Sequence, residues 1–243
     1  MRVAVISDIH GNLHALEAVL DAVDTAQPDE VWCLGDLVGY GPRPNECCAS
    51  VAGRAAICLA GNHDLGVLGA ADVDLADFSP DAAASARWTR SALEDEWHRY
   101  LARLEPSAER ARVQLFHASP RDPVWEYVLS PEAMIAALDL TTAQIVLVGH
   151  SHVPIAYAQS RELVFGAALA GAEADLSGQR WLLNPGSVGQ PRDGDPRASF
   201  LLLDLAAERA WFRRVEYDIR RTKREIREQG LPDALASRLG RGE

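Results

Sequence analysis

The chain has 243 residues, of which 48% are apolar, and its formal net charge at pH 7 is −11. The length is near the upper end for one α/β domain, and the apolar fraction excludes a disordered protein. The acidic balance argues against a surface for long duplex nucleic acid, because such surfaces need Lys and Arg to meet the phosphates. We expect a single domain over residues 1–243.

The first part of the chain alternates strand and helix patterns. Strands are predicted at residues 2–7, 30–34 and 56–60, and helices at 12–23, where Asn12 is the N-cap, and at 45–51. This β-α-β-α-β order predicts parallel strands joined by right-handed crossovers.

The middle of the chain is more helical. Residues 72–80 are acidic and weakly patterned, which indicates a loop or lid, and helices are expected over about 81–104. Strands at 112–116 and 144–148 follow, separated by a helix at 131–138.

After Gly149 the pattern changes to short strands separated by turns, without room for crossover helices. They are predicted at residues 155–159, 163–165, 181–184, 199–204 and 210–217. Such spacing is typical of antiparallel pairing. We therefore expect the two halves of the chain to form two packed sheets.

A charged helix is predicted at residues 218–229, ending near Gly230 and followed by a frayed tail. Its basic residues alternate with Glu and Asp at helical spacing. This favours a solvated helix with i,i+4 ion pairs over a patch that binds RNA or phosphate.

The sequence shows no sign of a membrane segment or of disulfides. The N-terminal run before Asp8 has no long apolar region, and no later stretch approaches a membrane span. The four cysteines form no C-x-x-C pair, and a chain of this length needs no disulfides, so we expect reduced thiols. These observations predict a soluble, cytoplasmic protein with no membrane partner.

Five of the seven histidines lie in loops directly after predicted strands, together with carboxylates and an amide. The histidines are His10, His63, His117, His150 and His152, and the accompanying groups are Asp8, Asp36, Asn62 and Asp64. Because the carboxyl ends of strands in an open α/β sheet meet at one edge, these groups should gather in one cleft. Such a mixed nitrogen and oxygen set suits divalent Mn, Fe, Zn or Mg. The other two histidines, His14 and His98, fall on predicted helices and are expected to be ordinary hydrogen-bonded residues.

Five short motifs together resemble the blocks of the calcineurin-like metallophosphoesterases. They are Asp8-Ile9-His10, Gly35-Asp36 with Gly41 five residues past the Asp, Gly61-Asn62-His63-Asp64, the isolated His117, and Gly149-His150-Ser151-His152. They stand in the family's order. Asn184-Pro185-Gly186-Ser187, followed by Pro191-Arg192, also resembles a loop of the small bacterial and archaeal phosphodiesterase branch, which has no large inserted domain.

The resemblance implies an α/β fold, a four-layer α-β-β-α sandwich of two mixed sheets, around two divalent metal ions. The ligands it implies are Asp8, His10, Asp36 and His152 for one ion and Asp36, Asn62, His117 and His150 for the other, with Asp36 bridging. Two such ions lower the pKa of a bridging water and clamp the phosphate oxygens. The ions are expected to be Mn, Fe, Zn, Ni or Co.

The resemblance places His63 over the scissile phosphate, as a proton donor to the leaving oxygen or a stabiliser of the transition state. Asp64 is expected to keep His63 protonated and oriented, since a nearby carboxylate raises the pKa of a histidine. Tyr40, Arg43 and Arg192 are candidates to contact substrate, although a plain loop role is equally compatible with each.

The predicted activity is hydrolysis of a phosphodiester by a hydroxide that bridges the two ions. Alternatives of the same fold are a phosphomonoesterase, a protein phosphatase, a nuclease acting on short or single-stranded substrates, and a non-catalytic protein-binding scaffold. The scaffold is disfavoured because the seven implied ligands and His63 are all present. The expected partner is a small phosphate ester, a class that includes nucleotides, and the sequence leaves a homo-oligomer open.

Overall fold

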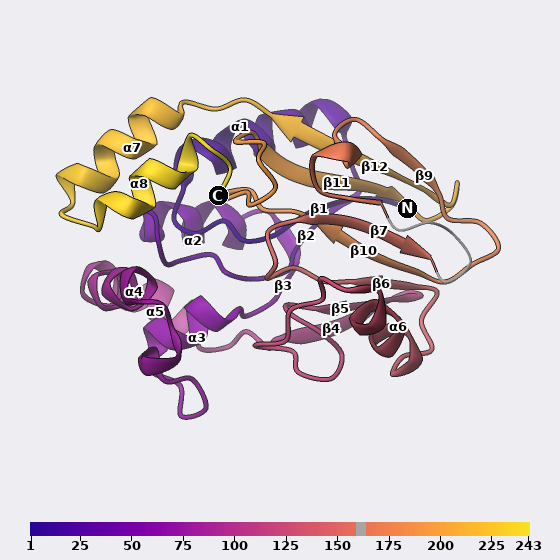
Figure 1. Ribbon diagram of the computed structural model, residues 1–243, viewed down its shortest axis with the longest axis horizontal. Coiled ribbons are helices and arrows are strands. Elements are labelled where there is room, and N and C mark those ends of the chain that lie inside the picture. The colour runs from indigo at the N-terminus through magenta and orange to yellow at the C-terminus, as the bar shows by residue number, and fades with distance from the viewer. Residues whose placement is uncertain (159–163) are drawn as a thin grey trace.

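The computed structural model describes residues 1–158 and 164–243 and contains two six-stranded sheets (Figure 1). The first sheet has the order β3-β2-β1-β11-β12-β9, with β1 at Arg2–Ile6, β2 at Glu30–Cys33, β3 at Ala55–Cys58, β9 at Glu173–Asp175, β11 at Ala198–Asp204 and β12 at Arg209–Val215. The second has the order β4-β5-β6-β10-β7-β8, with β4 at Ser107–Arg110, β5 at Val113–Phe116, β6 at Ile145–Leu147, β7 at Pro154–Ala158, β8 at Val164–Phe165 and β10 at Trp181–Pro185.

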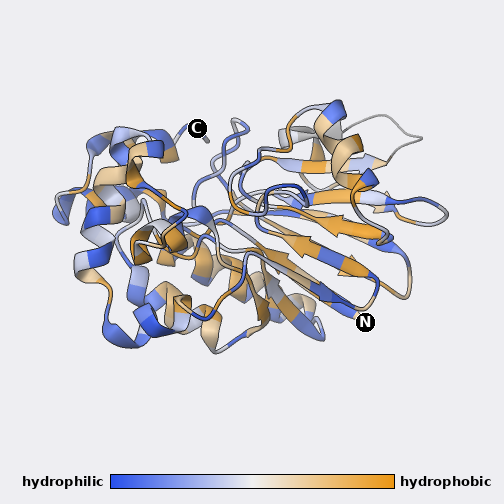
Figure 2. Ribbon diagram, turned by 90° about the horizontal axis from the view of Figure 1, so that it is seen from below, coloured by the Kyte–Doolittle hydropathy of each residue, from blue (hydrophilic) through white to orange (hydrophobic). Residues whose placement is uncertain are grey.

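Helices of the first half of the chain cover the outer face of the first sheet, and one helix covers that of the second, which gives the expected four layers. The helices are α1 at Leu13–Ala26, α2 at Pro44–Ala52, α3 at Asn62–Leu68, α4 at Pro80–Ala92, α5 at Asp95–Leu101, α6 at Pro131–Asp139, α7 at Ile219–Glu228 and α8 at Asp233–Leu239. Asn12 caps α1 as predicted, because its side chain accepts a hydrogen bond from the backbone of Ala15. Figure 2 shows the strands largely in hydrophobic colours.

The alternation of side chains along β1 shows how the layers pack. Val3 and Val5 point into the core between the two sheets, where they join residues such as Leu147. Ala4 and Ile6 point to the other side and pack in the cluster that includes α1 and α2. Since neighbouring side chains of a strand face opposite ways, one short strand contributes to two cores. A third cluster joins α6 to the outer face of the second sheet.

The parallel pairing predicted for the first strands is confirmed, but the assignment of each half of the chain to its own sheet is wrong. β1, β2 and β3 are parallel neighbours. The late strand β11 then pairs with β1 in antiparallel register, with Val3 opposite Leu203. β10 likewise lies between β6, to which it is parallel, and β7, to which it is antiparallel. Both sheets are therefore mixed.

The end of the chain also differs from the expectation, because α8 replaces the frayed tail. Its apolar residues Leu235, Ala236 and Leu239 are buried in a cluster with Ile226 of α7 and Tyr40. They recur at helical spacing, and the packing of that face stabilises a short helix that would be marginal alone.

Two short strands were not predicted, namely β4 and β9. Both lie at sheet edges and consist mainly of polar residues, so they lack the apolar alternation of buried strands. Residues 159 and 163, which were included in predicted strands, lie outside the described residues. Within the described part of the chain, no helix has both the length and the apolar character required to cross a membrane.

Candidate metal centre

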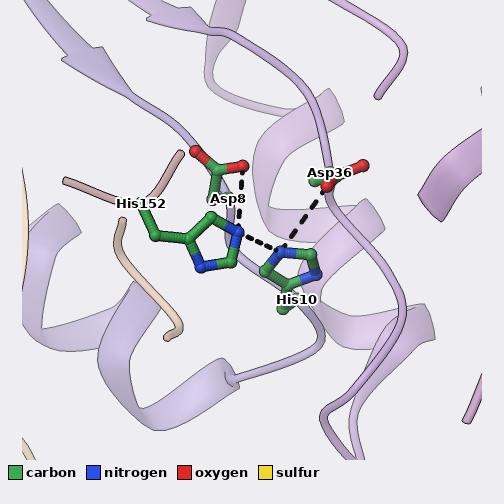
Figure 3. A group of neighbouring side chains, drawn as sticks. All are labelled: Asp8, His10, Asp36 and His152. Atoms are coloured by element: carbon green, nitrogen blue, oxygen red, sulfur yellow. Dashed lines mark hydrogen bonds and ion pairs between the residues drawn. The ribbon is translucent and has the colours of Figure 1, made fainter. Parts of the chain in front are cut away.

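The predicted ligand residues meet at one edge of the two sheets. Asp8 and His10 follow β1, Asp36 follows β2, and Asn62 begins α3 after β3. His117 follows β5, and His150 and His152 follow β6. Their ligand atoms form two groups, each within 4.8 Å, and Asp36 is common to both. The groups are Asp8, His10, Asp36 and His152, shown in Figure 3, and Asp36, His117 and His150.

In the first group, the ring nitrogens of His10 and His152 that carry lone pairs face each other. Nδ1 of His10 lies 3.2 Å from the carbonyl oxygen of Val38, and Nδ1 of His152 lies 2.6 Å from that of Gln190. A carbonyl only accepts, so each Nδ1 carries the proton and each Nε2 is left with a lone pair. These two Nε2 atoms are nevertheless 3.0 Å apart (Figure 3). Two facing lone pairs at this distance suit a shared cation, and a hydrogen bond of each ligand ring to a carbonyl is usual at metal sites.

The second group repeats this arrangement. Nδ1 of His117 donates to the carbonyl oxygen of Leu34 at 2.8 Å, which leaves its Nε2 facing Oδ1 of Asn62 at 3.2 Å. Nε2 of His150 lies 3.2 Å from the carbonyl oxygen of Trp125, which leaves its Nδ1 as the free ligand atom. Burial, and after it the charges of His117 and Arg192, lower the pKa of His150 to about 2, so the ring is neutral.

The carboxylates of Asp8 and Asp36 are buried between the histidines, and three of their four oxygens lack hydrogen-bond partners among the described residues. Both oxygens of Asp8 and Oδ2 of Asp36 are in this condition. Burial is the main reason that the pKa of Asp8 is raised to about 7 and that of Asp36 well above its ordinary value. An unpaired buried carboxylate is costly unless a cation compensates it. The donor set, the lone pairs and the unpartnered oxygens all fit divalent metal ions.

Asp36 is held so that one oxygen faces both groups. Its Oδ1 accepts a hydrogen bond from the backbone N–H of His63 at 2.8 Å. Its Oδ2 lies 3.6 Å from Nε2 of His10 and 3.6 Å from Nε2 of His117. A single carboxylate oxygen thus stands between the two ligand groups.

The backbone around the site is strained. Asp8, His10, Asp36, His150 and His152 have φ angles between 50° and 61°, a region that residues other than glycine seldom adopt. Such conformations persist only where the surroundings enforce them, and they cluster at functional sites. Gly61 is required for a different reason: a Cβ there would lie 2.0 Å from Oδ1 of Asp36.

The loop of Asn184 to Ser187 supports the ligand loops and does not line the site itself. The side-chain amide of Asn184 donates to the carbonyl oxygen of Gly149 at 2.8 Å and to Ser151 Oγ at 3.0 Å. Ser187 Oγ donates to the carbonyl oxygen of Asp8 at 2.8 Å. This loop therefore fixes the two segments that carry Asp8, His150 and His152.

His63 lies beside the two groups and belongs to neither. Its ring packs 4.4 Å from that of Tyr40 and 5.0 Å from that of Phe78, and its Nδ1 has no partner among the described residues. The expected pairing with Asp64 is wrong. The Asp64 carboxylate accepts from the backbone N–H groups of Leu37, Val38 and Gly61. Burial, and then the charge of Arg192, lower the pKa of His63 well below its ordinary value.

Of the three candidate substrate contacts, two lie at the cleft and one does not. The Arg192 guanidinium donates to Tyr40 Oη at 3.3 Å, and both residues line a cavity of 280 Å³ together with Asn62 and His63. Arg43 instead pairs with Glu225 and Glu46. Of the two roles left open for Arg43, these ion pairs favour the plain loop role.

Comparison with known proteins identifies the family. The model of the calcineurin-like phosphoesterase superfamily domain matches residues 1–208. The chain belongs to this superfamily. A metallophosphoesterase of Sphaerobacter thermophilus, of known crystal structure, is 41% identical and superposes with a TM-score of 0.88 over 100% of this chain and 99% of that one. The uncharacterized protein MJ0912 of Methanocaldococcus jannaschii is 36% identical over 242 residues, which cover 98% of this chain and 96% of that protein.

A more distant relative carries a named activity. Phosphodiesterase YfcE of Escherichia coli K12 is 26% identical over 208 residues, which cover 84% of this chain and 88% of YfcE. The family, the buried ligand cluster and this relative together identify the chain as a metal-dependent phosphoesterase.

Sequence reasoning missed several residues of the cleft. Phe78, Trp125, Tyr127 and Arg238 line the same cavity as His63. Phe78 stood in the segment described as a loop or lid, and Arg238 in the segment described as a tail. The aromatic pair in Trp125-Glu126-Tyr127, close after His117, was the available signal, because exposed aromatic residues in loops favour ligand contact.

Proposed function

We propose that the chain hydrolyses small phosphodiesters with two divalent metal ions. The first would be held by Asp8, His10, Asp36 and His152, and the second by Asp36, Asn62, His117 and His150. The observation that carries the proposal is the facing of proton-free ring nitrogens and unpartnered carboxylate oxygens in both groups.

The position of Asp36 supports a pair of ions over a single one. Its Oδ2 is equally distant from a histidine of each group, as a bridging ligand would be. Two adjacent ions supply positive charge for the phosphate oxygens and activate water for attack. The neutral amide of Asn62 adds an oxygen ligand without further negative charge against the incoming phosphate.

The chain's own residues would position the ester and help the leaving group. The ring of His63 lies 4.8 Å from that of His10 and lines the cavity, where it can donate a hydrogen bond to the leaving oxygen or stabilise the transition state. Arg192 and Tyr40 line the same cavity and would contact the phosphate ester. With Asn62 and His63 they form one continuous lining from candidate ligand to cleft rim.

A diester is favoured by the resemblance of the 184–192 loop to the small phosphodiesterase branch, an argument from likeness. We propose Mn as an activating ion, with Fe, Zn, Ni and Co as alternatives. A cytoplasmic location is supported by the four cysteines, which are all free thiols. The single-domain organisation over 1–243 also remains a prediction.

The test is a hydrolysis panel on metal-free protein reloaded with Mn, Zn, Fe, Ni, Co or Mg in turn. Bis-nitrophenyl phosphate and nitrophenyl phosphate are compared at matched concentrations. We expect faster hydrolysis of the diester with Mn. A monoester preference of about tenfold, or roughly 1.4 kcal/mol in transition-state free energy, would instead assign the chain as a phosphomonoesterase.

A further inference from the structure

The cleft beside the metal centre holds two arginines that pair with no Asp or Glu side chain among the described residues. Arg192 donates only to neutral groups, namely the Gln190 side chain and Tyr40 Oη. Among the described residues, the side chain of Arg238, on α8, donates to the backbone oxygen of Glu243, the last residue of the sequence, and to no Asp or Glu side chain. Many other arginines of this acidic chain pair with carboxylate side chains, as Arg214 does with Asp193.

The two guanidinium groups line the same cavity, and the charge of Arg192 acts on Arg238. Both line the 280 Å³ space that also contacts Asn62 and His63, and the residues described there include one carboxylate, Asp77. Arg238 is half-buried, and burial, followed by the charge of Arg192, lowers its pKa. Two like charges brought together in a partly buried cavity are unfavourable unless an anion binds between or beside them.

The remaining wall of the cavity is aromatic. Phe78 and Trp125 are in edge contact at 5.1 Å, and Tyr127 stacks on the ring of His150 at 4.1 Å while 49% of Tyr127 is exposed. Trp125 is tied to the metal centre, because its carbonyl oxygen accepts the hydrogen bond from His150. Partly exposed rings beside basic groups suit the stacking of a nucleobase.

We propose that Arg238 and Arg192 form a second anion subsite, and that Trp125 and its aromatic neighbours stack a base, so that the substrate is a nucleotide with a phosphate beyond the scissile one. This inference rests on the proposed function, since it assumes that the scissile phosphate binds at the metal groups. The cavity volume lies near the lower end of ligand sites, about 300–1,000 Å³. Arg238 would be the residue that selects such substrates over simple diesters.

The test is calorimetric binding to Mn-reloaded protein of three probes: inorganic phosphate, AMP and α,β-methylene-ADP, whose P–C–P link resists hydrolysis. Chromatography after each titration checks that the AMP is intact. We expect affinity to rise from phosphate to AMP to α,β-methylene-ADP. In Arg238→Gln the advantage of α,β-methylene-ADP over AMP should fall about tenfold or more, as for loss of a hydrogen bond to a charged group.

Three further variants sharpen the result. Arg238→Lys should give an intermediate ratio of the affinities for α,β-methylene-ADP and AMP, because lysine keeps the positive charge and lacks the planar, two-pronged guanidinium. Arg224→Gln, which removes an exposed arginine of α7 paired with Glu228, should keep the wild-type ratio. Trp125→Ala should reduce the advantage of AMP over phosphate by about tenfold, as for loss of a base-stacking ring.

If Arg238→Gln keeps the wild-type ratio of the affinity for α,β-methylene-ADP to the affinity for AMP, the anion subsite is overturned. If Trp125→Ala keeps the wild-type ratio of the affinity for AMP to the affinity for phosphate, the stacking wall is overturned. If Arg238→Gln also loses phosphate binding, the anion subsite is judged from Arg238→Lys instead. A wild-type ratio of the affinities for α,β-methylene-ADP and AMP in Arg238→Lys then overturns the subsite. Binding that depends on Arg238 in a protein that hydrolyses no diester would contradict only the proposed function. A diesterase whose nucleotide binding ignores Arg238 would contradict only this inference.

Discussion

The Nε2 atoms of His10 and His152 lie 3.0 Å apart, and neither can donate a hydrogen bond to the other. The opposite nitrogen of each ring is already a donor to a backbone carbonyl. Burial, the largest cause in both rings, lowers the pKa of His10 and of His152 well below the ordinary value, so neither ring carries a second proton. This pair is best explained as two ligands that converge on one cation.

The first prediction concerns the number of metal ions that the chain binds. Metal-free protein reloaded with Mn should bind two ions per chain, and Asp36→Asn should reduce this number, because it removes the negative charge between the two groups. Elemental analysis after gel filtration gives the stoichiometry. Glu225→Gln, which changes a buried carboxylate held by Arg43 and His14, is the control and should retain both ions. Two tightly bound ions in Asp36→Asn would rule out the bridging role.

The second prediction separates chemistry from metal binding at His63. His63→Ala should keep both ions and lower kcat by roughly 10²–10⁴, the usual effect of losing a group positioned to transfer or share a proton in the transition state. The loss of kcat should be smaller for a nitrophenolate ester than for an alkyl ester, because a leaving group of low pKa needs little protonation. His98→Ala, on the exposed face of α5, is the matched control. Loss of a metal ion in His63→Ala, or near wild-type turnover of the alkyl ester, would refute the assignment.

A third prediction concerns the close approach of the backbone at Gly61. In Gly61→Ala the added Cβ would meet Oδ1 of Asp36 at 2.0 Å, so Asp36 must move. We expect a loss of about 1–3 kcal/mol in the free energy of unfolding, as for overpacked sites, together with weaker metal binding. Gly53→Ala serves as the comparison, since the φ of Gly53 is −79° and the added Cβ would lie 3.4 Å from the carbonyl oxygen of Ala49, an ordinary contact distance. Denaturant unfolding with and without Mn measures both effects.

A fourth prediction uses Glu225, which joins α7 to α1 and to the loop before α2. Burial raises its pKa, but hydrogen bonds and charge from Arg43 and His14 outweigh burial and lower the pKa to about 2, against 4.5 ordinarily. A lowered carboxylate pKa stabilises the fold fully above pH 4.5 and loses that contribution as the pH falls toward 2. Glu225→Gln should therefore cost roughly 1–3 kcal/mol at pH 7.

The difference between Glu225→Gln and wild type should shrink as the pH of unfolding experiments falls from 5 to 3. Glu96→Gln, an exposed residue of α5, should match wild type throughout. A difference that stays constant with pH would mean that the shape of the side chain matters and its charge does not.

Much of the site could be predicted because the ligands sit at strand ends, where sequence position and spatial position are linked. The gathering of Asp8, Asp36 and His117 follows from parallel strands sharing an edge. The pairing of His63 with Asp64 failed because consecutive residues of a helix point in different directions. Asp64 turns back to the backbone of the 36–38 loop, while His63 turns to the cleft.

The strand order was beyond prediction for a different reason. The apolar pattern of β11 does not determine whether its neighbour is β1 or a strand from the second half of the chain, because many strands offer similar pairing surfaces. Arg238 was missed for a related cause. Its approach to Arg192 depends on how α8 packs against Tyr40, a contact between distant segments that no local pattern encodes.

The pairing of β1 with β11 has a consequence for the order of events during synthesis. A nascent chain that has reached residue 152 already carries every candidate metal ligand. Yet β1, which leads into Asp8 and His10, still lacks the neighbour that places Val3 opposite Leu203. Pairings between such distant segments form slowly, and an uncovered strand edge invites aggregation meanwhile. The metal centre should therefore close only when the last strands leave the ribosome.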